Sequence, residues 1–364
     1  MPITFSEKIA RIPHYEAGTA SVDGAERQGA RDVAQLASNE SPYPPVEGVV
    51  EAVREAATTV NRYPDPAARE LRLALADRFE LPAARIAVGN GSCEILLAAA
   101  EALLEPETEV IYAWPSFSMY PHLAAITGAE AVTVPLAEGD VHDLEAMRLA
   151  VTARTRMLLV CNPNNPTATY LPSKEIVEFL QRVPSSVLVV LDEAYVEFQL
   201  VEDPDTTLAL LDRFPNVVLL RTFSKVYGLA GLRVGYALGT EEFRQAVDRV
   251  RQPFAVNKLA QAAATEALRH QDDVARRVER NATERLWVAE ALAERGLRAA
   301  RSEANFFWLE LGDHDEMEVV RELGRRGVAV RAGEGLGGPG HIRVTYGPRV
   351  ENQRLIEALD EILA

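Results

Sequence analysis

One lysine, Lys225, lies in a segment whose other side chains are suited to binding a phosphate. The segment RTFSKVYGLAGLRVGY, residues 221–236, follows an apolar run and supplies two hydroxyls, Thr222 and Ser224, and the guanidinium of Arg233. Hydroxyl and guanidinium groups bind phosphate oxygens, and a lysine amine can hold an aldehyde as a Schiff base. A single lysine is usually a surface charge, so this interpretation depends on partners elsewhere in the sequence.

Four more apolar runs end in side chains that suit the same kind of ligand. Asp192 follows VLVVL, Asn162 follows MLLVC, and Phe117 follows EVIY and offers a flat ring for stacking. Ser92 opens a helix after IAVG, where free backbone N–H groups and the helix dipole favour a phosphate. Each residue alone has an ordinary structural interpretation: an ion pair or helix cap for Asp192, a turn for Asn162, an N-cap for Ser92 and a core ring for Phe117.

Taken together, these side chains point to one ligand. In open α/β sheets, ligands bind beyond the carboxyl ends of the strands, so the five sets of side chains are expected to meet at one edge. A phosphate cradle, a stacking ring, a carboxylate for a pyridinium nitrogen, donors for a phenolic oxygen and an amine match pyridoxal 5′-phosphate. The rival use of a glycine-rich turn, dinucleotide binding, requires GxGxxG, which GNGSCE does not match.

The elements that must position these groups are strands alternating with helices. Continuous apolar runs separated by amphipathic stretches are typical of an α/β fold with a mainly parallel sheet covered on both faces. We expect an irregular arm over 1–35, a large α/β cofactor domain over 36–254 and a smaller α+β domain over 255–364. The strands expected in the large domain are 86–88, 109–112, 131–134, 157–161, 187–191, 217–220 and 234–238.

Composition argues against several classes of protein. The 364 residues carry 38 basic and 54 acidic side chains, a formal charge of −16, with no Lys/Arg block of the kind that binds nucleic acid or membranes. Cys93 and Cys161 are too few for a disulfide framework and lie in no metal-binding spacing. No apolar run reaches the ~20 residues that a bilayer-spanning helix needs. We expect a cytoplasmic protein without a metal, nucleic-acid or membrane partner.

The motifs, in this order, resemble the fold-type I pyridoxal-phosphate aminotransferases, and within them the histidinol-phosphate aminotransferase group, which is close to aromatic amino-acid aminotransferases. The resemblance extends over nearly the whole chain, and the combination is specific although each fragment alone is weak. It rests on IPHY, LASNESPYPP, NRYPDP, GNGSCE, CNPNNPT, LDEAYVEF, RTFSKVYGLAGLRVGYA, RQPFAVN, EANFFW and HIRVTYG.

The resemblance implies catalytic and ring-binding roles. Lys225 would carry the cofactor and, once substrate releases it, move the proton between the substrate Cα and C4′ of the cofactor. Asp192 would pair with the ring nitrogen and keep it protonated. Asn162 and Tyr195 would bond the phenolate oxygen, and Phe117 would stack on the ring.

Further positions would hold the phosphate and the substrate. Tyr63 would reach the phosphate from a neighbouring subunit, which implies a homodimer with shared active sites. Arg343, Arg331 and Tyr15 would bind the anionic end of the substrate, and Asn39 would line the pocket. Within one subunit the phosphate would be held by Ser92, the backbone of Cys93, Thr222, Ser224 and Arg233.

Three positions depart from the family pattern. Phe117 stands where tyrosine is common, so stacking is kept and a hydroxyl is lost. Cys93 replaces a frequent aspartate, which is compatible with a contact through the backbone N–H. Ala168 follows NPNNPT where glycine is usual, which leaves the conformation of that turn open.

The implied reaction is a ping-pong transamination, with glutamate and 2-oxoglutarate as one amino donor and oxo-acid pair. For the other pair we first expect histidinol phosphate and imidazole acetol phosphate, in histidine biosynthesis, because two guanidiniums suit a phosphate or a carboxylate. The alternative is an aromatic amino-acid aminotransferase acting on phenylalanine or tyrosine. Elimination or decarboxylation on the same cofactor, and a non-catalytic ligand-binding relative, also stay open.

Overall fold

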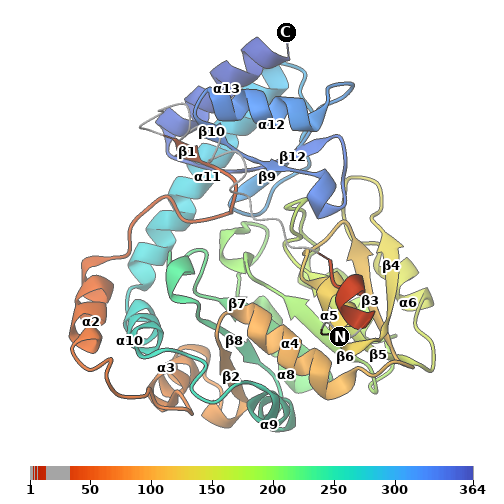
Figure 1. Ribbon diagram of the computed structural model, residues 1–364, viewed down its shortest axis with the longest axis vertical. Coiled ribbons are helices and arrows are strands. Elements are labelled where there is room, and N and C mark those ends of the chain that lie inside the picture. Colours follow the sequence, from red (N-terminus) through yellow and green to blue (C-terminus); the bar gives the residue numbers. More distant parts are fainter. Residues whose placement is uncertain (1–2, 4, 6, 14–32, 364) are drawn as a thin grey trace.

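A mostly parallel seven-stranded sheet lies at the centre of the larger part of the molecule (Figure 1). The structure is a computed structural model and describes residues 3, 5, 7–13 and 33–363. Of the seven strands, in the order β2-β8-β7-β6-β5-β3-β4, β8 runs antiparallel to its neighbours. The predicted α/β class is confirmed. The strands are β2 (Ile86–Gly89), β3 (Glu109–Trp114), β4 (Glu130–Pro135), β5 (Thr155–Cys161), β6 (Leu188–Asp192), β7 (Val217–Thr222) and β8 (Gly235–Leu238).

Both faces of this sheet are buried, which explains why its strands read as continuous apolar runs. Successive strand residues point to opposite faces, and Val189 and Val190 of β6 accordingly belong to two different hydrophobic clusters. One cluster is covered by α3 (Arg69–Phe79), α6 (Leu144–Leu149), α7 (Ser173–Leu180) and α8 (Leu210–Arg213). The other is covered by α4 (Ser92–Leu103), α5 (Tyr120–Thr127) and α9 (Glu241–Val250).

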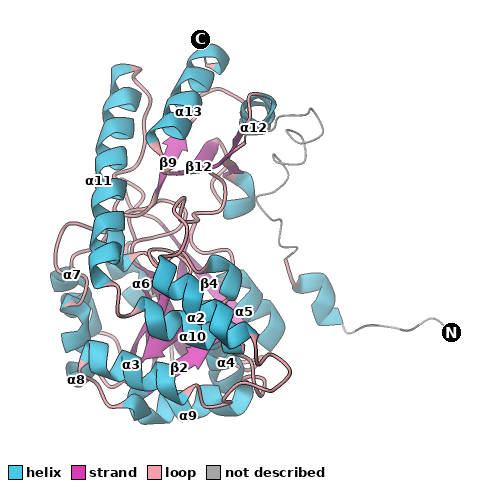
Figure 2. Cartoon of the chain, turned by 90° about the vertical axis from the view of Figure 1, so that its left-hand side faces the viewer, coloured by secondary structure: helices cyan, strands magenta, loops and turns pink. Residues whose placement is uncertain are grey.

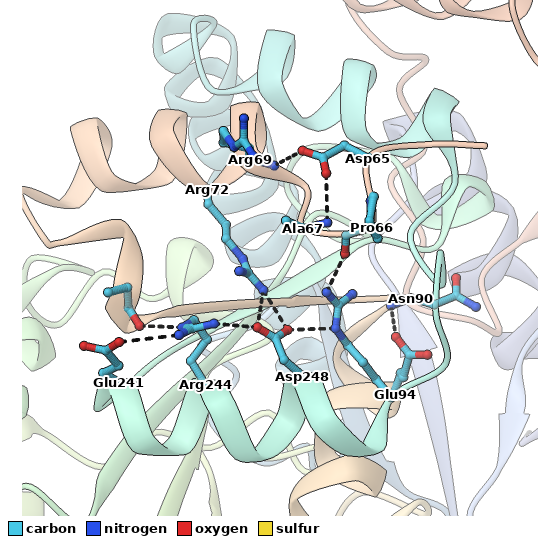
Figure 3. A network of polar contacts seen from close by, with 12 residues as sticks. Asp65, Pro66, Ala67, Arg69, Arg72, Asn90, Glu94, Glu241, Arg244 and Asp248 are labelled. Atoms are coloured by element: carbon cyan, nitrogen blue, oxygen red, sulfur yellow. Dashed lines mark hydrogen bonds and ion pairs between the residues drawn. The ribbon is translucent and has the colours of Figure 1, made fainter. Parts of the chain in front are cut away.

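A polar network joins these two helical layers near the edge strand β2 (Figure 3). Arg72 of α3 donates hydrogen bonds to both carboxylate oxygens of Asp248 of α9, at 2.7 and 2.9 Å. Arg244 and Arg251 donate to the same carboxylate. Because three guanidiniums surround one largely buried carboxylate, the network fixes α3 and α9 relative to each other.

A second, smaller core is built by the C-terminal part of the chain, which lies above the large sheet in Figure 1. Its antiparallel sheet has the order β11-β12-β9. Two early residues, Ala34 and Leu36, also belong to this core, because β1 pairs in parallel with β10. The elements are β1 (Ala34–Gln35), β9 (Phe306–Glu310), β10 (Val328–Ala329), β11 (Arg331–Ala332), β12 (His341–Thr345), α12 (Glu316–Arg325) and α13 (Arg349–Ile362).

The helix α10 (Lys258–Ala267), which the sequence-based limits assign to the small domain, packs against helices of the large domain. Its alanines Ala260, Ala263 and Ala264 are buried in the cluster of the large sheet, against α2 (Glu47–Ala57) and α3. Small side chains on one face let helices approach closely, which the amphipathic pattern alone did not reveal. The limits 36–254 and 255–364 therefore remain predictions.

The long helix α11 (Gln271–Glu294) runs alongside both cores, as Figure 2 shows. Its first half packs near the large sheet through Val274 and Val278, and its second half enters the C-terminal core through Val288 and Leu292. Short 3-10 helices complete the structure: η1 (Glu7–Arg11), η2 (Ala83–Arg85), η3 (Val196–Phe198), η4 (Thr206–Ala209), η5 (Ala230–Leu232) and η6 (Glu334–Leu336).

Candidate active site

A cavity of about 360 Å³ lies where the strands of the large sheet end. Its wall is formed by residues that follow β3, β5, β6 and β7, by the start of α4 and by the segment before β8. Most of the residues predicted from the sequence meet there. The lining comprises Ser38, Glu40, Ser92, Cys93, Phe117, Cys161, Asn165, Asp192, Ala194, Tyr195, Thr222, Ser224, Lys225, Ala230, Gly231 and Arg233.

Lys225 extends into this cavity from the loop after β7. Its Nζ donates to the backbone oxygens of Ser38 and Asn39, at 3.4 and 3.1 Å. Burial, and then the positive charge of Arg343, lowers the pKa of Lys225 to about 8. The lowered pKa makes the unprotonated, nucleophilic form of the amine easier to reach near neutral pH than for an ordinary lysine.

Asp192 has one carboxylate oxygen with a donor and one without. Its Oδ2 accepts a hydrogen bond of 3.1 Å from Tyr120, whereas its Oδ1 has no hydrogen-bond partner among the described residues. The side chain is 2% exposed, and burial raises its pKa to about 6. A buried acceptor without a donor is costly unless a ligand supplies one. The protonated nitrogen of a pyridine ring in the cavity would be such a donor.

The start of α4 and the segment before β8 form an anion cradle. No side chain caps the N-terminus of α4, so its first N–H groups are available to a ligand. The hydroxyl of Ser224 accepts from Thr222 at 3.0 Å and from Arg233 at 3.4 Å. A Cβ on Gly91, which has a φ of 76°, would lie 2.6 Å from Nη2 of Arg233. The glycine thus leaves room for the guanidinium at the helix start.

The hydroxyl of Tyr195 is held by the early segment of the chain. Nδ2 of Asn39 donates to Oη of Tyr195 at 3.1 Å, and burial raises the pKa of that phenol. Asn39 has a φ of 52°, and its N–H donates to Oγ1 of Thr345. The Asn39 side chain is buried beside Tyr195 and is not among the lining residues, but its backbone oxygen accepts from Lys225, so its place beside the substrate stays a prediction.

The predicted position of Asn162 needs a correction. Its side-chain amide donates to the backbone oxygen of Leu171 and accepts from the backbone N–H of the same residue, so it serves the turn and does not line the cavity. Asn165, three residues further in the same motif, lines the cavity instead. Its Oδ1 accepts a hydrogen bond of 2.7 Å from Arg343.

Phe117 lines the cavity, and its ring packs edge-on against Tyr120 with centroids 5.7 Å apart. Tyr120, which the sequence reasoning did not single out, is thereby positioned between Phe117 and Asp192. Ser38 and Glu40 were missed as well, although their segment, LASNES, was recognised as a motif. No local pattern singles out Tyr120, because its hydrogen bond joins it to Asp192, 72 positions further along the chain.

Two arginines face each other beside the cavity. Arg331 of β11 and Arg343 of β12 are direct partners in the antiparallel register, so their side chains lie on the same face of the small sheet. They are 9% and 8% exposed. Arg343 also donates to the backbone oxygen of Ala37. Two like charges at directly opposite positions favour an anion between them.

Two further positions were predicted for the site, and one position that departs from the family pattern can also be examined. Tyr63 lies away from the cavity, is 79% exposed and stacks on Phe254 with ring centroids 4.5 Å apart. Tyr15 lies outside the described residues. Ala168, at the position where glycine is usual, adopts a left-handed φ of 62°. The turn after NPNNPT therefore forms with alanine, in a backbone region that favours glycine.

The chain belongs to the class I and II aminotransferases, a family that it matches over residues 31–360. It is 46% identical to an aromatic amino acid aminotransferase of Streptomyces coelicolor, covering 97% of this chain and 96% of that protein. It is 41% identical to a histidinol-phosphate aminotransferase of a Geobacillus species, covering 98% and 97%.

Solved structures of aminotransferases have the same fold as this chain. Histidinol-phosphate aminotransferase from Sinorhizobium meliloti, in complex with pyridoxal 5′-phosphate, superposes with a TM-score of 0.89 at 31% identity, covering 99% of this chain and 97% of that chain. The protein is therefore a pyridoxal-phosphate-dependent aminotransferase, as the sequence predicted. Within the described part of the chain, no helix combines the length and apolarity needed to cross a membrane.

Proposed function

We propose that this protein transfers the amino group of an aromatic amino acid, phenylalanine or tyrosine, to 2-oxoglutarate. The reaction type rests on one observation: a single cavity contains Lys225, Asp192 with its unpartnered oxygen, and the anion cradle. Relatives named as aromatic amino acid aminotransferases, at 46%, 48% and 44% identity, support the substrate. This order reverses the one expected from the sequence, which put histidinol phosphate first.

In this proposal one cavity residue, Asp192, interacts with the cofactor ring, and another, Lys225, transfers the substrate proton. Bound pyridoxal 5′-phosphate supplies an electron sink for the bonds of the substrate α-carbon. Asp192 would accept the N–H of the ring and keep that nitrogen protonated. Lys225, whose pKa is lowered to about 8, would take the proton from the substrate α-carbon and deliver it to C4′ of the cofactor.

The remaining cavity residues orient the cofactor. Tyr195 and Asn165 would bond the phenolate oxygen, so the role expected for Asn162 passes to Asn165. Phe117 would pack on the ring and exclude water from one face. The N–H groups of Ser92 and Cys93, together with Thr222, Ser224 and Arg233, would hold the phosphate.

Arg343 and Arg331 bind the substrate anion. Their opposed positions on β11 and β12 place two guanidiniums on one face, and Arg343 is connected to the cavity through Asn165. A carboxylate between them neutralises both charges and fixes the α-carbon beside Lys225. Because 2-oxoglutarate and phenylalanine both carry an α-carboxylate, one anion site serves both half-reactions.

A homodimer is part of the proposal. Tyr63 and Phe254 form an exposed aromatic pair, and Val60, also exposed, lies on the same groove. Exposed aromatic clusters of this kind favour a protein partner, and a second copy would bring Tyr63 to the phosphate of its neighbour. The two cysteines are free, which fits the proposed cytoplasmic location.

The second candidate substrate is histidinol phosphate. Relatives named for it are 41% and 40% identical, and two opposed guanidiniums also suit a phosphate monoester. The test is kcat/KM for phenylalanine, tyrosine and histidinol phosphate, each with 2-oxoglutarate and with glutamate formation as the readout. We expect at least about tenfold preference for the aromatic amino acids, a difference of ~1.4 kcal/mol in activation free energy.

A reversed preference would transfer the assignment to histidinol phosphate. Release of pyruvate or CO2 without glutamate would instead indicate elimination or decarboxylation. Each of these outcomes contradicts the proposal in a distinguishable way.

A further inference from the structure

A fully buried ion pair lies directly behind the cavity. Arg221 and Glu193 are each 2% exposed, and Nε of Arg221 donates to Oε2 of Glu193 at 2.8 Å. Neither side chain lines the cavity. Arg221 donates two more hydrogen bonds, to Oδ1 of Asp205 at 2.7 Å and to the backbone oxygen of Pro204 at 2.8 Å. Every branch of its guanidinium is thus engaged.

The pair is adjacent in sequence to two residues of the site. Glu193 follows Asp192 at the end of β6, and Arg221 precedes Thr222 at the end of β7. The two strands are neighbours, Asp192 is in register with Leu220, and the N–H of Glu193 donates to the backbone oxygen of Leu220 at 2.8 Å. Asp192 and Leu220 are the last pair in register between β6 and β7, and the Glu193–Arg221 ion pair links the residue that follows each of them. Asp192 lies on one side of this link, and Thr222 of the phosphate cradle lies on the other.

The pair also places opposite charges next to Asp192. The negative charge of Glu193 raises the pKa of Asp192, in the same direction as the larger effect of burial. Burial raises the pKa of Glu193 itself, and Arg221 opposes that shift. Arg221 thus favours the ionised form of Glu193 and places a positive charge against its negative charge.

We propose that Arg221 and Glu193 are positioning residues, which hold Asp192 at a fixed distance from the phosphate cradle and balance the charge behind it. The inference rests on the roles proposed above for Asp192 and Thr222. Neither residue touches the cofactor or the substrate; both act through the side chain next to them in the sequence.

Other charges near this pair contribute to the same field and must be kept constant in a test. Asp205 also binds Arg78, at 2.7 Å, and so retains a cation when Arg221 is replaced. The groups near the pair include Asp205, Glu197, Arg78, Tyr170, Tyr227 and Tyr236, and those near Asp192 include Tyr120, Tyr195, Cys93, Cys161 and Lys225.

The test is a pH titration of the visible absorbance of the cofactor-loaded protein without substrate, because its midpoint reports the proton on the bond between Lys225 and the cofactor. Arg221→Met removes a positive charge and should raise the midpoint by about half a unit. Glu193→Gln removes a negative charge, keeps the shape and should lower the midpoint by a similar amount. The double variant should return it to the wild-type value.

A purely structural role predicts a different pattern. Both single variants would then lower Tm, with midpoints that stay at the wild-type value or move in the same direction, and this result would overturn the proposal. Arg221→Lys restores the charge and should restore the midpoint. The matched control is Arg285→Met, which breaks another largely buried pair, with Glu303, at 2.9 Å. A shift in this control as large as that in Arg221→Met would also overturn the proposal.

Because no substrate is present, this result does not depend on the aromatic preference. An error in the proposed substrate would appear only in the kcat/KM comparison.

Discussion

The hydroxyl of Tyr120 donates a hydrogen bond of 3.1 Å to Oδ2 of Asp192, whereas Oδ1 of this buried carboxylate has no hydrogen-bond partner among the described residues. The tyrosine is itself fully buried, at the start of α5. It connects the layer of helices to the end of β6. The bond also opposes the effect of burial on the carboxylate, because a donor stabilises the ionised form.

Tyr120→Phe should therefore weaken catalysis without displacing the ring of Phe117. The loss of the donor raises the pKa of Asp192 above about 6, so less of the carboxylate is ionised at neutral pH. We expect kcat/KM to fall about tenfold, with a steeper loss below neutral pH. Tyr112→Phe is the control, since this buried ring packs on Tyr120 but does not bond to Asp192. Equal losses in both variants would contradict the role of the hydrogen bond.

Lys225→Ala should abolish multiple turnover while leaving the fold intact. The apo wild-type protein should capture pyridoxal 5′-phosphate at a rate that rises with pH up to about 8 and then levels, because the free amine reacts. The variant should show no such pH-dependent capture, as followed by visible absorbance. Lys174→Ala, on an exposed face of α7, should behave as the wild type. Ordinary turnover by Lys225→Ala would refute the assignment.

Arg331→Gln should separate stability from function. It removes one of two like charges at opposed positions, so the free energy of unfolding should stay unchanged or rise by about 0.5 kcal/mol. KM for both phenylalanine and glutamate should rise about tenfold, since each loses a guanidinium partner. Arg325→Gln on α12 serves as the exposed control. Denaturant unfolding and steady-state kinetics measure the two effects; a stable variant with unchanged KM would exclude Arg331 from the anion site.

His142 should make the protein sensitive to mild acid. Its Nε2 donates to the backbone oxygen of Cys161 at 2.8 Å, its Nδ1 has no partner within the described structure, and burial lowers its pKa to about 4. The unfolded chain binds the proton near pH 6.5, so stability is lost as pH falls from 6.5 towards 4.

By pH 5 this histidine should cost about 2 kcal/mol of the free energy of unfolding. In His142→Gln that part of the pH dependence should vanish, whereas in His314→Gln, at an exposed position, it should persist. Urea unfolding at pH 7 and pH 5 compares the three proteins. The same pH dependence in His142→Gln as in the wild type would show that the histidine is not its source.

The strands were predictable because burial on both faces leaves a local signal. All seven predicted runs are strands, within a few residues at each end. The reversed direction of β8 was not predicted, since an apolar run looks the same in either direction. The packing of α10 was missed for a related reason, because the alanines that allow its close approach to α2 are apolar in any environment.

The site residues that could be predicted from the sequence are those that lie at or shortly after the end of a strand. Asp192 is the last residue of β6 and Lys225 lies three residues beyond the end of β7, so the sequence positions alone predicted both at the sheet edge. The choice between Asn162 and Asn165 depends on the path of a turn. The segment NPNNP offers several asparagines, and its sequence does not show which of them faces the cavity. Tyr120 was missed because its role lies in a contact with a residue 72 positions away.

The pairing of β1 with β10 has a consequence for how the chain folds. Ala34 aligns with Val328, and the N–H of Asn39 bonds Thr345, 306 positions further along. Contacts between residues so far apart in the chain form slowly, because a large loop must close first. During synthesis these contacts must wait until residue 345 has left the ribosome. The carbonyls of Ser38 and Asn39 that bond Lys225 are therefore expected to reach their places among the last, and the cavity to become complete only in the final stage of folding.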